Sequence, residues 1–99
     1  MTGRACVLTK LSEAKRFKPG DILVTVATSP SWTPLIHAAS AVVTDVGGAL
    51  SHAAIVCREY GKPAVVGTGD GTKRIKNGNQ ITVDGGKGVV VHIQSSVLV

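Results

Sequence analysis

Apolar residues occur in this chain as short runs separated by glycine, proline and polar turns. Short runs rich in valine, isoleucine and leucine are typical of buried strands, because β-branched side chains fit a pleated surface. Turn residues such as Pro19-Gly20-Asp21 and Asn77-Gly78 separate several of these runs. The pattern predicts about six short strands, over residues 5–9, 22–26, 41–44, 64–66, 80–83 and 88–93.

The best-defined helix is expected over residues 51–60. Apolar side chains recur there at helical spacing, in a stripe that consists of Leu50, Ala53, Cys57 and Tyr60. The apolar segment from Ala53 to Cys57 is predicted to be largely buried. Gly61 is suited to the position after the helix, and Pro63 prevents the helix from resuming. Shorter helical segments are expected over residues 11–17, 32–36 and 72–76.

Strands that alternate with helices in one short chain predict an α/β domain of layered sheet and helices. The 99 residues suit a single domain spanning residues 1–99, with an ordered core over about residues 4–93 and a loose tail from Gln94. Hydrophobic residues make up 43% of the chain and only three residues are aromatic. We therefore expect a folded core built from aliphatic side chains.

Charge and composition exclude several classes of function. The net charge is +5, but its lysines and arginines are not interleaved with stacking aromatics, so a nucleic-acid partner is not expected. No apolar stretch approaches the ~20 residues that span a bilayer, and no signal peptide is visible. Cys6 and Cys57 lie in apolar runs, which predicts buried thiols in a cytoplasmic protein.

The chemically informative stretch runs from Val42 to Gly67, where a strand, a double glycine and Ser51-His52 precede the helix. Gly47 and Gly48 let the backbone turn sharply. The free N–H groups of the helix that follows form an anion site. The positive field at a helix start favours neutral imidazole, which is a nucleophile. His52 is therefore a candidate phosphoryl acceptor, although an ordinary half-buried histidine would fit the same pattern.

Other readings of these residues are weaker. The glycine fingerprints of dinucleotide-binding folds and P-loops are absent. A metal site built from His37, His92, His52 and Cys57 is not expected, because no paired spacing links them. Ser51 and His52 are adjacent on a helix and point apart, which disfavours a hydrolase. Asp45 could orient His52 or face water, and Arg58 could reach a phosphate or be solvated.

The segment TDVGGALSHAAIVCREYGKPAVVG, residues 44–67, closely resembles the signature of the mobile phosphohistidine domain of PEP-utilizing enzymes. That family includes phosphoenolpyruvate synthase, pyruvate phosphate dikinase, Enzyme I of the sugar phosphotransferase system and rifampicin phosphotransferase. Residues 19–24 resemble the family's upstream strand and residues 84–91 its closing hairpin. The resemblance covers roughly residues 4–93.

The resemblance implies a swivelling β/β/α domain in which His52 accepts a phosphoryl group on Nε2. It also implies that the pocket around the phosphohistidine is shaped by Thr44, Gly47, Gly48 and Ser51. Such a domain is the phosphotransferase component of a larger enzyme and is not catalytically complete alone. An ATP-grasp domain with ATP and Mg²⁺ would phosphorylate it, and it would deliver the group to an acceptor-substrate domain, for example to pyruvate or to an antibiotic hydroxyl. The domain itself is expected to bind no cofactor or metal.

Two positions depart from the family's pattern. Leu50 stands where Thr or Ser is usual, which removes one hydroxyl near the expected phosphoryl group. Cys57 stands where a small residue such as Ala is usual, a change that concerns packing. The alternative to a phosphoryl carrier is a non-catalytic module of the same fold that only binds an anion or docks to a partner.

Overall fold

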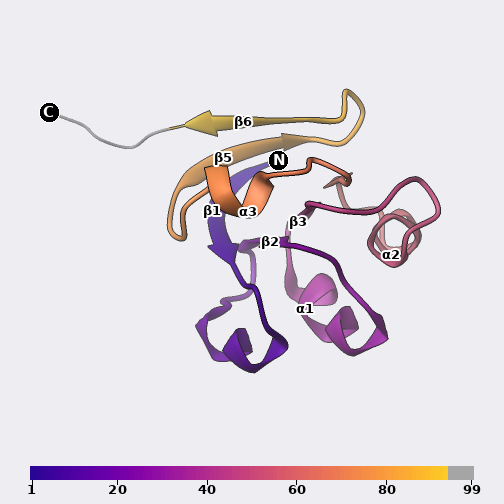
Figure 1. Cartoon of the computed structure of the whole chain (residues 1–99), viewed down its shortest axis with the longest axis horizontal. Helices are drawn as coiled ribbons and strands as arrows, with labels where there is room; N and C mark the ends of the chain where they lie inside the picture. Colours follow the sequence, from indigo (N-terminus) through magenta and orange to yellow (C-terminus); the bar gives the residue numbers. More distant parts are fainter. Residues whose placement is uncertain (94–99) are drawn as a thin grey trace, which may run out of the picture.

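The computed structural model describes residues 1–93, which form one twisted six-stranded sheet with helices on its faces (Figure 1). The strands are β1 (Thr2–Val7), β2 (Ile22–Thr25), β3 (Ala41–Thr44), β4 (Ala64–Val65), β5 (Gln80–Asp84) and β6 (Val89–Ile93). The α-helices are α1 (Thr33–Ala38), α2 (His52–Glu59) and α3 (Gly71–Arg74), and the 3₁₀ helices are η1 (Leu11–Arg16) and η2 (Pro30–Trp32).

The strands follow the order β4-β3-β2-β1-β5-β6 across the sheet. Neighbouring strands from β1 to β4 are parallel, whereas β5 and β6 are antiparallel to their neighbours. Val7 pairs with Val24, and Val24 pairs with Val43, so β1, β2 and β3 end at one edge of the sheet. The loops that follow these three strands therefore lie together, and the loops after β2 and β3 contribute to the candidate site.

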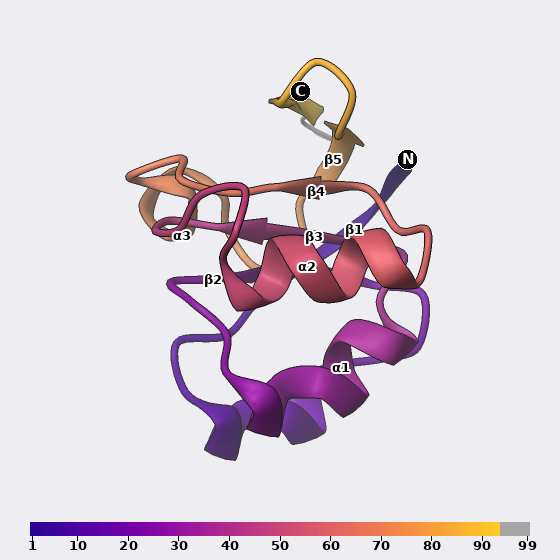
Figure 2. The ribbon, with the colours of Figure 1, turned by 90° about the vertical axis from the view of Figure 1, so that its right-hand side faces the viewer.

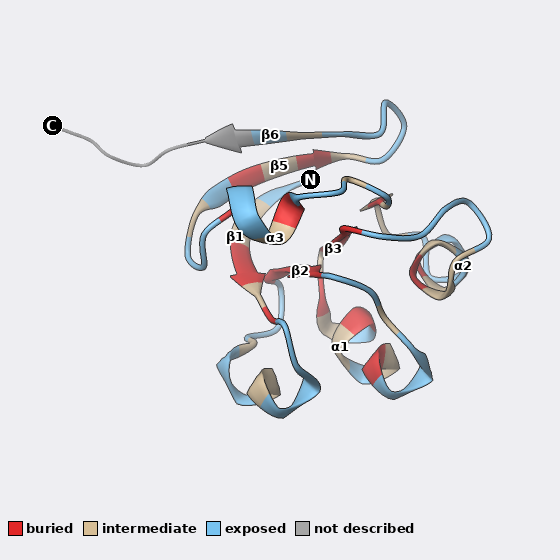
Figure 3. Ribbon diagram, viewed as in Figure 1, coloured by how far each residue is buried: buried red, intermediate tan, exposed pale blue. Residues whose placement is uncertain are grey.

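Helices α1 and α2 pack on one face of the sheet (Figure 2). Side chains from this face of β1, β2 and β3 bury against them, and the interface is coloured as buried in Figure 3. The cluster contains Cys6, Leu8, Leu23, Trp32, Ile36, Ala39, Val42, Ala53 and Cys57. Trp32 is the only aromatic side chain among these buried residues, as expected for a core of aliphatic packing.

The opposite face is covered by the short helix α3 and by the sheet's own β5–β6 hairpin. The β5–β6 hairpin curls over the parallel strands. As a result, β5 contacts β3 and β4, although β3, β2 and β1 lie between β4 and β5 in the strand order. A side chain added at Gly85 would come within 3.2 Å of the Ala64 nitrogen, which shows how closely the hairpin turn approaches β4. Ile81 and Val83 of β5 complete this second core. Two β layers and one helical layer confirm the β/β/α arrangement.

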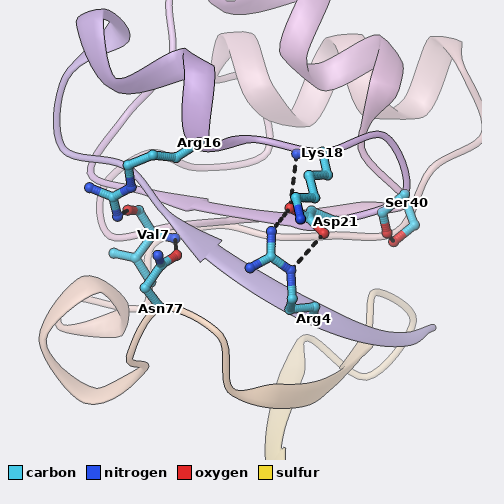
Figure 4. Close-up of polar contacts among 8 residues, drawn as sticks. Arg4, Val7, Arg16, Lys18, Asp21, Ser40 and Asn77 are labelled. Atoms are coloured by element: carbon cyan, nitrogen blue, oxygen red, sulfur yellow. Dashed lines mark hydrogen bonds and ion pairs between the residues drawn. The ribbon is translucent and has the colours of Figure 1, made fainter.

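The predicted strands are present, with one difference at the N-terminus. Strand β1 begins at Thr2 rather than Ala5, because Thr2 to Arg4 pair with β5, a partner nearly eighty residues away that local pattern does not reveal. Arg4 is also fixed by a bidentate ion pair to the buried Asp21, with Nη2 and Oδ2 2.6 Å apart (Figure 4). The segment predicted as a helix over residues 11–17 is the 3₁₀ helix η1, and Pro19 prevents its extension.

The segment predicted to be largely buried, Ala53 to Cys57, is buried at Ala53 and Cys57, whereas Ile55 between them is 38% exposed. The two end members of the stripe lie outside the helix. Leu50 lies in the loop before the helix and is 85% exposed. Tyr60 lies at the C-cap, and its ring rests on the exposed His37 with the centroids 4.5 Å apart. The predicted loose tail from Gln94 lies outside the described residues. Within residues 1–93, no helix combines the length and apolar character needed to cross a bilayer.

Both cysteines are buried free thiols, as predicted, and the core around them disfavours the thiolate. Desolvation raises the pKa of Cys57 to about 11, from an ordinary value of 9.0.

Between these two pKa values the unfolded chain releases a proton that the folded chain retains, so the free energy of unfolding should fall as pH rises from about 9 to about 11. Urea unfolding at pH 8 and pH 10.5 should show a smaller decrease in the free energy of unfolding for Cys57→Ala than for the wild type. Equal losses would contradict this assignment.

Candidate functional site

His52 is the first residue of α2, at the sheet edge where the parallel strands end. The chain leaves β3 at Thr44, passes through the loop of residues 45–51 and enters the helix. Ser51 is the N-cap, and its hydroxyl accepts a hydrogen bond from the Ala54 N–H at 3.4 Å. The sequence prediction of a helix beginning with Ser51-His52 is therefore confirmed, and the unpaired N–H groups of this first turn open beside the imidazole.

The imidazole of His52 is held from the neighbouring strand by a residue that the sequence reasoning missed. Thr28 follows β2, and its Oγ1 lies 2.8 Å from Nδ1 of His52. No other described group forms a hydrogen bond with the ring, so Nε2 remains available to a ligand. The ring is half-buried rather than enclosed. The sequence could have indicated this contact only by placing a hydroxyl residue, Thr28, in the loop after β2, since β2 is the neighbour of β3.

Two glycines in the site are required by the backbone. Gly47 has φ +117°, and a Cβ there would lie 2.9 Å from the Cβ of Ser51. Gly67 has φ +72°, and a Cβ there would lie 2.8 Å from the carbonyl oxygen of Gly47. The loop that follows β4 is thus in close contact with the turn that leads to His52. Gly48, in contrast, faces open space, so no neighbouring atom requires glycine there.

Thr44 is buried, and its hydroxyl donates to the Val46 carbonyl at 2.9 Å. The carbonyl of Thr44 in turn accepts from the N–H and the hydroxyl of Thr68. Within the described structure, Thr44 therefore stabilises the loop of residues 45–51 at its β3 end. The pocket made of Thr44, Gly47, Gly48 and Ser51 stays a prediction, with the hydroxyls of Thr44 and Ser51 engaged in backbone contacts.

Asp45 neither orients His52 nor faces water. Its side chain is buried and accepts hydrogen bonds from the N–H of Thr72 at 2.9 Å and from the Thr72 hydroxyl at 2.6 Å. The hydroxyl of Thr68 lies 3.5 Å from the same carboxylate. Asp45 thus ties the end of β3 to the start of α3. No pattern in the sequence indicates Thr72 as the partner of Asp45.

Arg58 is exposed, yet its guanidinium is not simply solvated. It donates to the Ala49 carbonyl at 3.1 Å, reaching back along α2 to the loop before His52. This bond closes the loop from the helix side, as Thr44 does from the strand side. Residues 1–93 contain no group of three or more His, Cys, Asp or Glu side chains placed to hold a metal ion.

The arrangement places one accessible ring nitrogen at a helix start, next to a loop that is fixed by hydrogen bonds of Thr44 and Arg58. Backbone N–H groups at a helix start bind anions, and an imidazole nitrogen with a free lone pair forms covalent intermediates. The geometry is therefore suited to a histidine that takes up an anionic group from solvent or from a partner.

Comparison with known proteins gives a consistent family match. The family model described as "PEP-utilising enzyme, mobile domain" matches residues 17–88. Phosphoenolpyruvate synthase from Aeropyrum pernix is 56% identical over 90 residues, covering 90% of this chain and 11% of the relative. "Uncharacterized phosphotransferase YvkC" from Bacillus subtilis is 47% identical over 95 residues, covering 96% of this chain and 11% of the relative.

A solved structure supports the same assignment. The NMR solution structure of Enzyme I (nEIt) superposes with a TM-score of 0.67 at 35% sequence identity, covering 77% of this chain and 32% of that one. The present chain spans about a tenth or less of the length of the curated relatives that it matches. It therefore corresponds to one part of much longer proteins.

Proposed function

Because the chain belongs to the mobile-domain family of PEP-utilising enzymes, we propose that it is a phosphoryl carrier that holds the phosphoryl group on Nε2 of His52. Its relatives are phosphoenolpyruvate synthases and phosphotransferases, and the chain is a domain of that phosphotransferase family. The observation that carries the proposal is the 2.8 Å contact between Thr28 Oγ1 and Nδ1 of His52, which occupies one ring nitrogen and leaves the other open.

The proposed step requires Nδ1 to carry the ring proton. Nδ1–H then donates to the Thr28 hydroxyl, and the lone pair on Nε2 attacks phosphorus. An N–P bond forms while the bond from phosphorus to the leaving group breaks, and the leaving group departs with its electron pair. The proton stays on Nδ1 throughout. Transfer to the acceptor reverses these bond changes.

Features around the ring support the charged product. A phosphoryl group on Nε2 carries negative charge beside the first turn of α2, where N–H groups and the helix dipole favour anions. The loop is fixed before the reaction by Thr44, Arg58 and the contact of Gly67 with Gly47, so little reorganisation is required. We place the phosphoryl donor, with ATP and Mg²⁺, and the acceptor site in other parts of a longer protein.

The proposal can be tested without a protein partner. Phosphoramidate should phosphorylate the chain once, with the P–N bond of the reagent breaking and ammonia leaving. Two-dimensional ¹⁵N–³¹P correlation should place the label on Nε2 of His52. Because Thr28 holds Nδ1, Thr28→Val should slow labelling about fivefold to tenfold, the effect of one hydrogen bond, whereas Thr28→Ser should stay near the wild-type rate.

The same experiment distinguishes the alternative function. A module that only binds anions would show reversible phosphate binding near α2 and no acid-labile N–P bond. A covalent label on Nδ1 of His52, or on His37, would overturn the assigned atom.

A further inference from the structure

The loop that leads to His52 presents apolar side chains to solvent. Leu50 is 85% exposed, Val46 is 53% exposed and Ile55 is 38% exposed. Gly47, Gly48 and Ala49 between Val46 and Leu50 are exposed as well, and residues 46–50 form the pale-blue part of this loop in Figure 3. We call Val46, Leu50 and Ile55 the collar. Exposed apolar side chains that adjoin a functional residue along the chain are typical of an interaction site.

Local structure does not account for the exposure of Leu50. Leu50 and Ile55 stand at the two positions, immediately before the N-cap and four residues into the helix, where apolar side chains commonly pack on each other to fix a helix start. At 85% exposure, Leu50 buries little surface against any neighbour. The start of α2 is instead fixed by Ser51 and Arg58. Leu50 is therefore left free for contact with another molecule.

Charge indicates what kind of molecule that is. The two segments that meet at His52, residues 22–29 and 46–57, contain no lysine, arginine, aspartate or glutamate. Phosphoryl transfer requires cationic neutralisation of the moving group, normally from Mg²⁺, lysine or arginine. The guanidinium of Arg58 at the border of this region is bonded to the Ala49 carbonyl. The cations must then come from the molecule that faces the collar.

We infer that the collar is the docking surface for the protein site that exchanges the phosphoryl group with His52, and that this site has an apolar mouth around a cationic interior. The inference rests on the proposed function. Leu50 and Val46 enter the mouth and exclude water, while the neutral surroundings of His52 avoid repulsion of the partner's cations. An exposed leucine buried in this way contributes about tenfold to affinity.

The test compares matched variants of the full chain with two phosphoryl donors. The collar variant is Leu50→Gln with Val46→Gln. The control is Leu11→Gln with Val91→Gln, which replaces the same residue types at exposed positions on η1 and β6. The small donor is phosphoramidate. The protein donor is the phosphoenolpyruvate synthase of Aeropyrum pernix supplied with ATP, with the histidine of its own mobile domain replaced.

With the protein donor, the collar variant should show a KM for the chain about tenfold or more above the wild type, while kcat changes little. With phosphoramidate, the collar variant should be labelled at the wild-type rate, and the control should match the wild type with both donors. Equal KM values for the collar and control variants would overturn the docking surface.

Two further outcomes distinguish failure of the docking surface from failure of the proposed phosphoryl-carrier function. If phosphoramidate leaves His52 unlabelled in the wild type, the proposed function fails, whatever the variants do. If sedimentation shows a wild-type dimer that the collar variant converts to a monomer, the collar packs against a second copy of the chain, and the assigned partner is wrong.

Discussion

Replacing His52 with asparagine should abolish phosphorylation of the chain, with labelling by phosphoramidate at least about 100-fold below the wild type. Asparagine retains a polar atom near the position of Nδ1, so the contact with Thr28 can persist, while the nucleophilic Nε2 is removed. Asparagine is also tolerated at a helix start, so α2 should still form. Acid-labile, alkali-stable label measured by mass spectrometry gives the readout.

His37→Asn is the matched control. His37 is exposed on α1 and contacts the ring of Tyr60, far from the loop before α2 in sequence. The control should be labelled at the wild-type rate. Thermal unfolding of both variants should remain close to the wild type, so that a loss of label reports chemistry rather than unfolding. Persistent labelling of His52→Asn at the wild-type level would show that another residue is the acceptor.

The part of the site that could be predicted from sequence is the part encoded locally. The position of His52 at a helix start could be predicted from local features, which are a buried strand, two glycines, Ser51 and an amphipathic helix. Each of these features depends only on neighbours within a few residues. The same holds for β3 at residues 41–44, whose limits agree with the prediction. The resemblance over residues 44–67 added the family, which the comparisons confirm.

The part that could not be predicted depends on which strands are neighbours. Thr28 reaches His52 only because β2 lies beside β3, and Thr2 joins β1 only because β5 pairs there in antiparallel fashion. Hydrophobic periodicity shows which side of a strand is buried, but not what the strand pairs with. The stripe also included Leu50, one residue before the predicted helix, and local spacing could not show that this residue lies in an exposed loop.

The second large effect is expected at Asp45, on stability. Asp45→Ala should lower the free energy of unfolding by about 3 kcal/mol, because it removes a buried acceptor of two short hydrogen bonds from Thr72 and leaves these partly buried donors unpaired. Asp45→Asn keeps one acceptor oxygen and should cost about 1 kcal/mol. Urea unfolding monitored by circular dichroism measures both.

Asp70→Ala is the control, since Asp70 is the exposed N-cap of α3 and its side chain forms no capping hydrogen bond. It should change stability by less than about 0.5 kcal/mol. Because Gly67 touches Gly47 and Asp45 anchors the same segment, folded Asp45→Ala should also label His52 more slowly than folded Asp70→Ala. If both variants lose the same stability, the buried contacts of Asp45 do not hold the end of β3 against α3. The loop before His52 would then be held by its other contacts, including those of Thr44 and Arg58 and the backbone bond from Val46 N–H to the Val26 carbonyl.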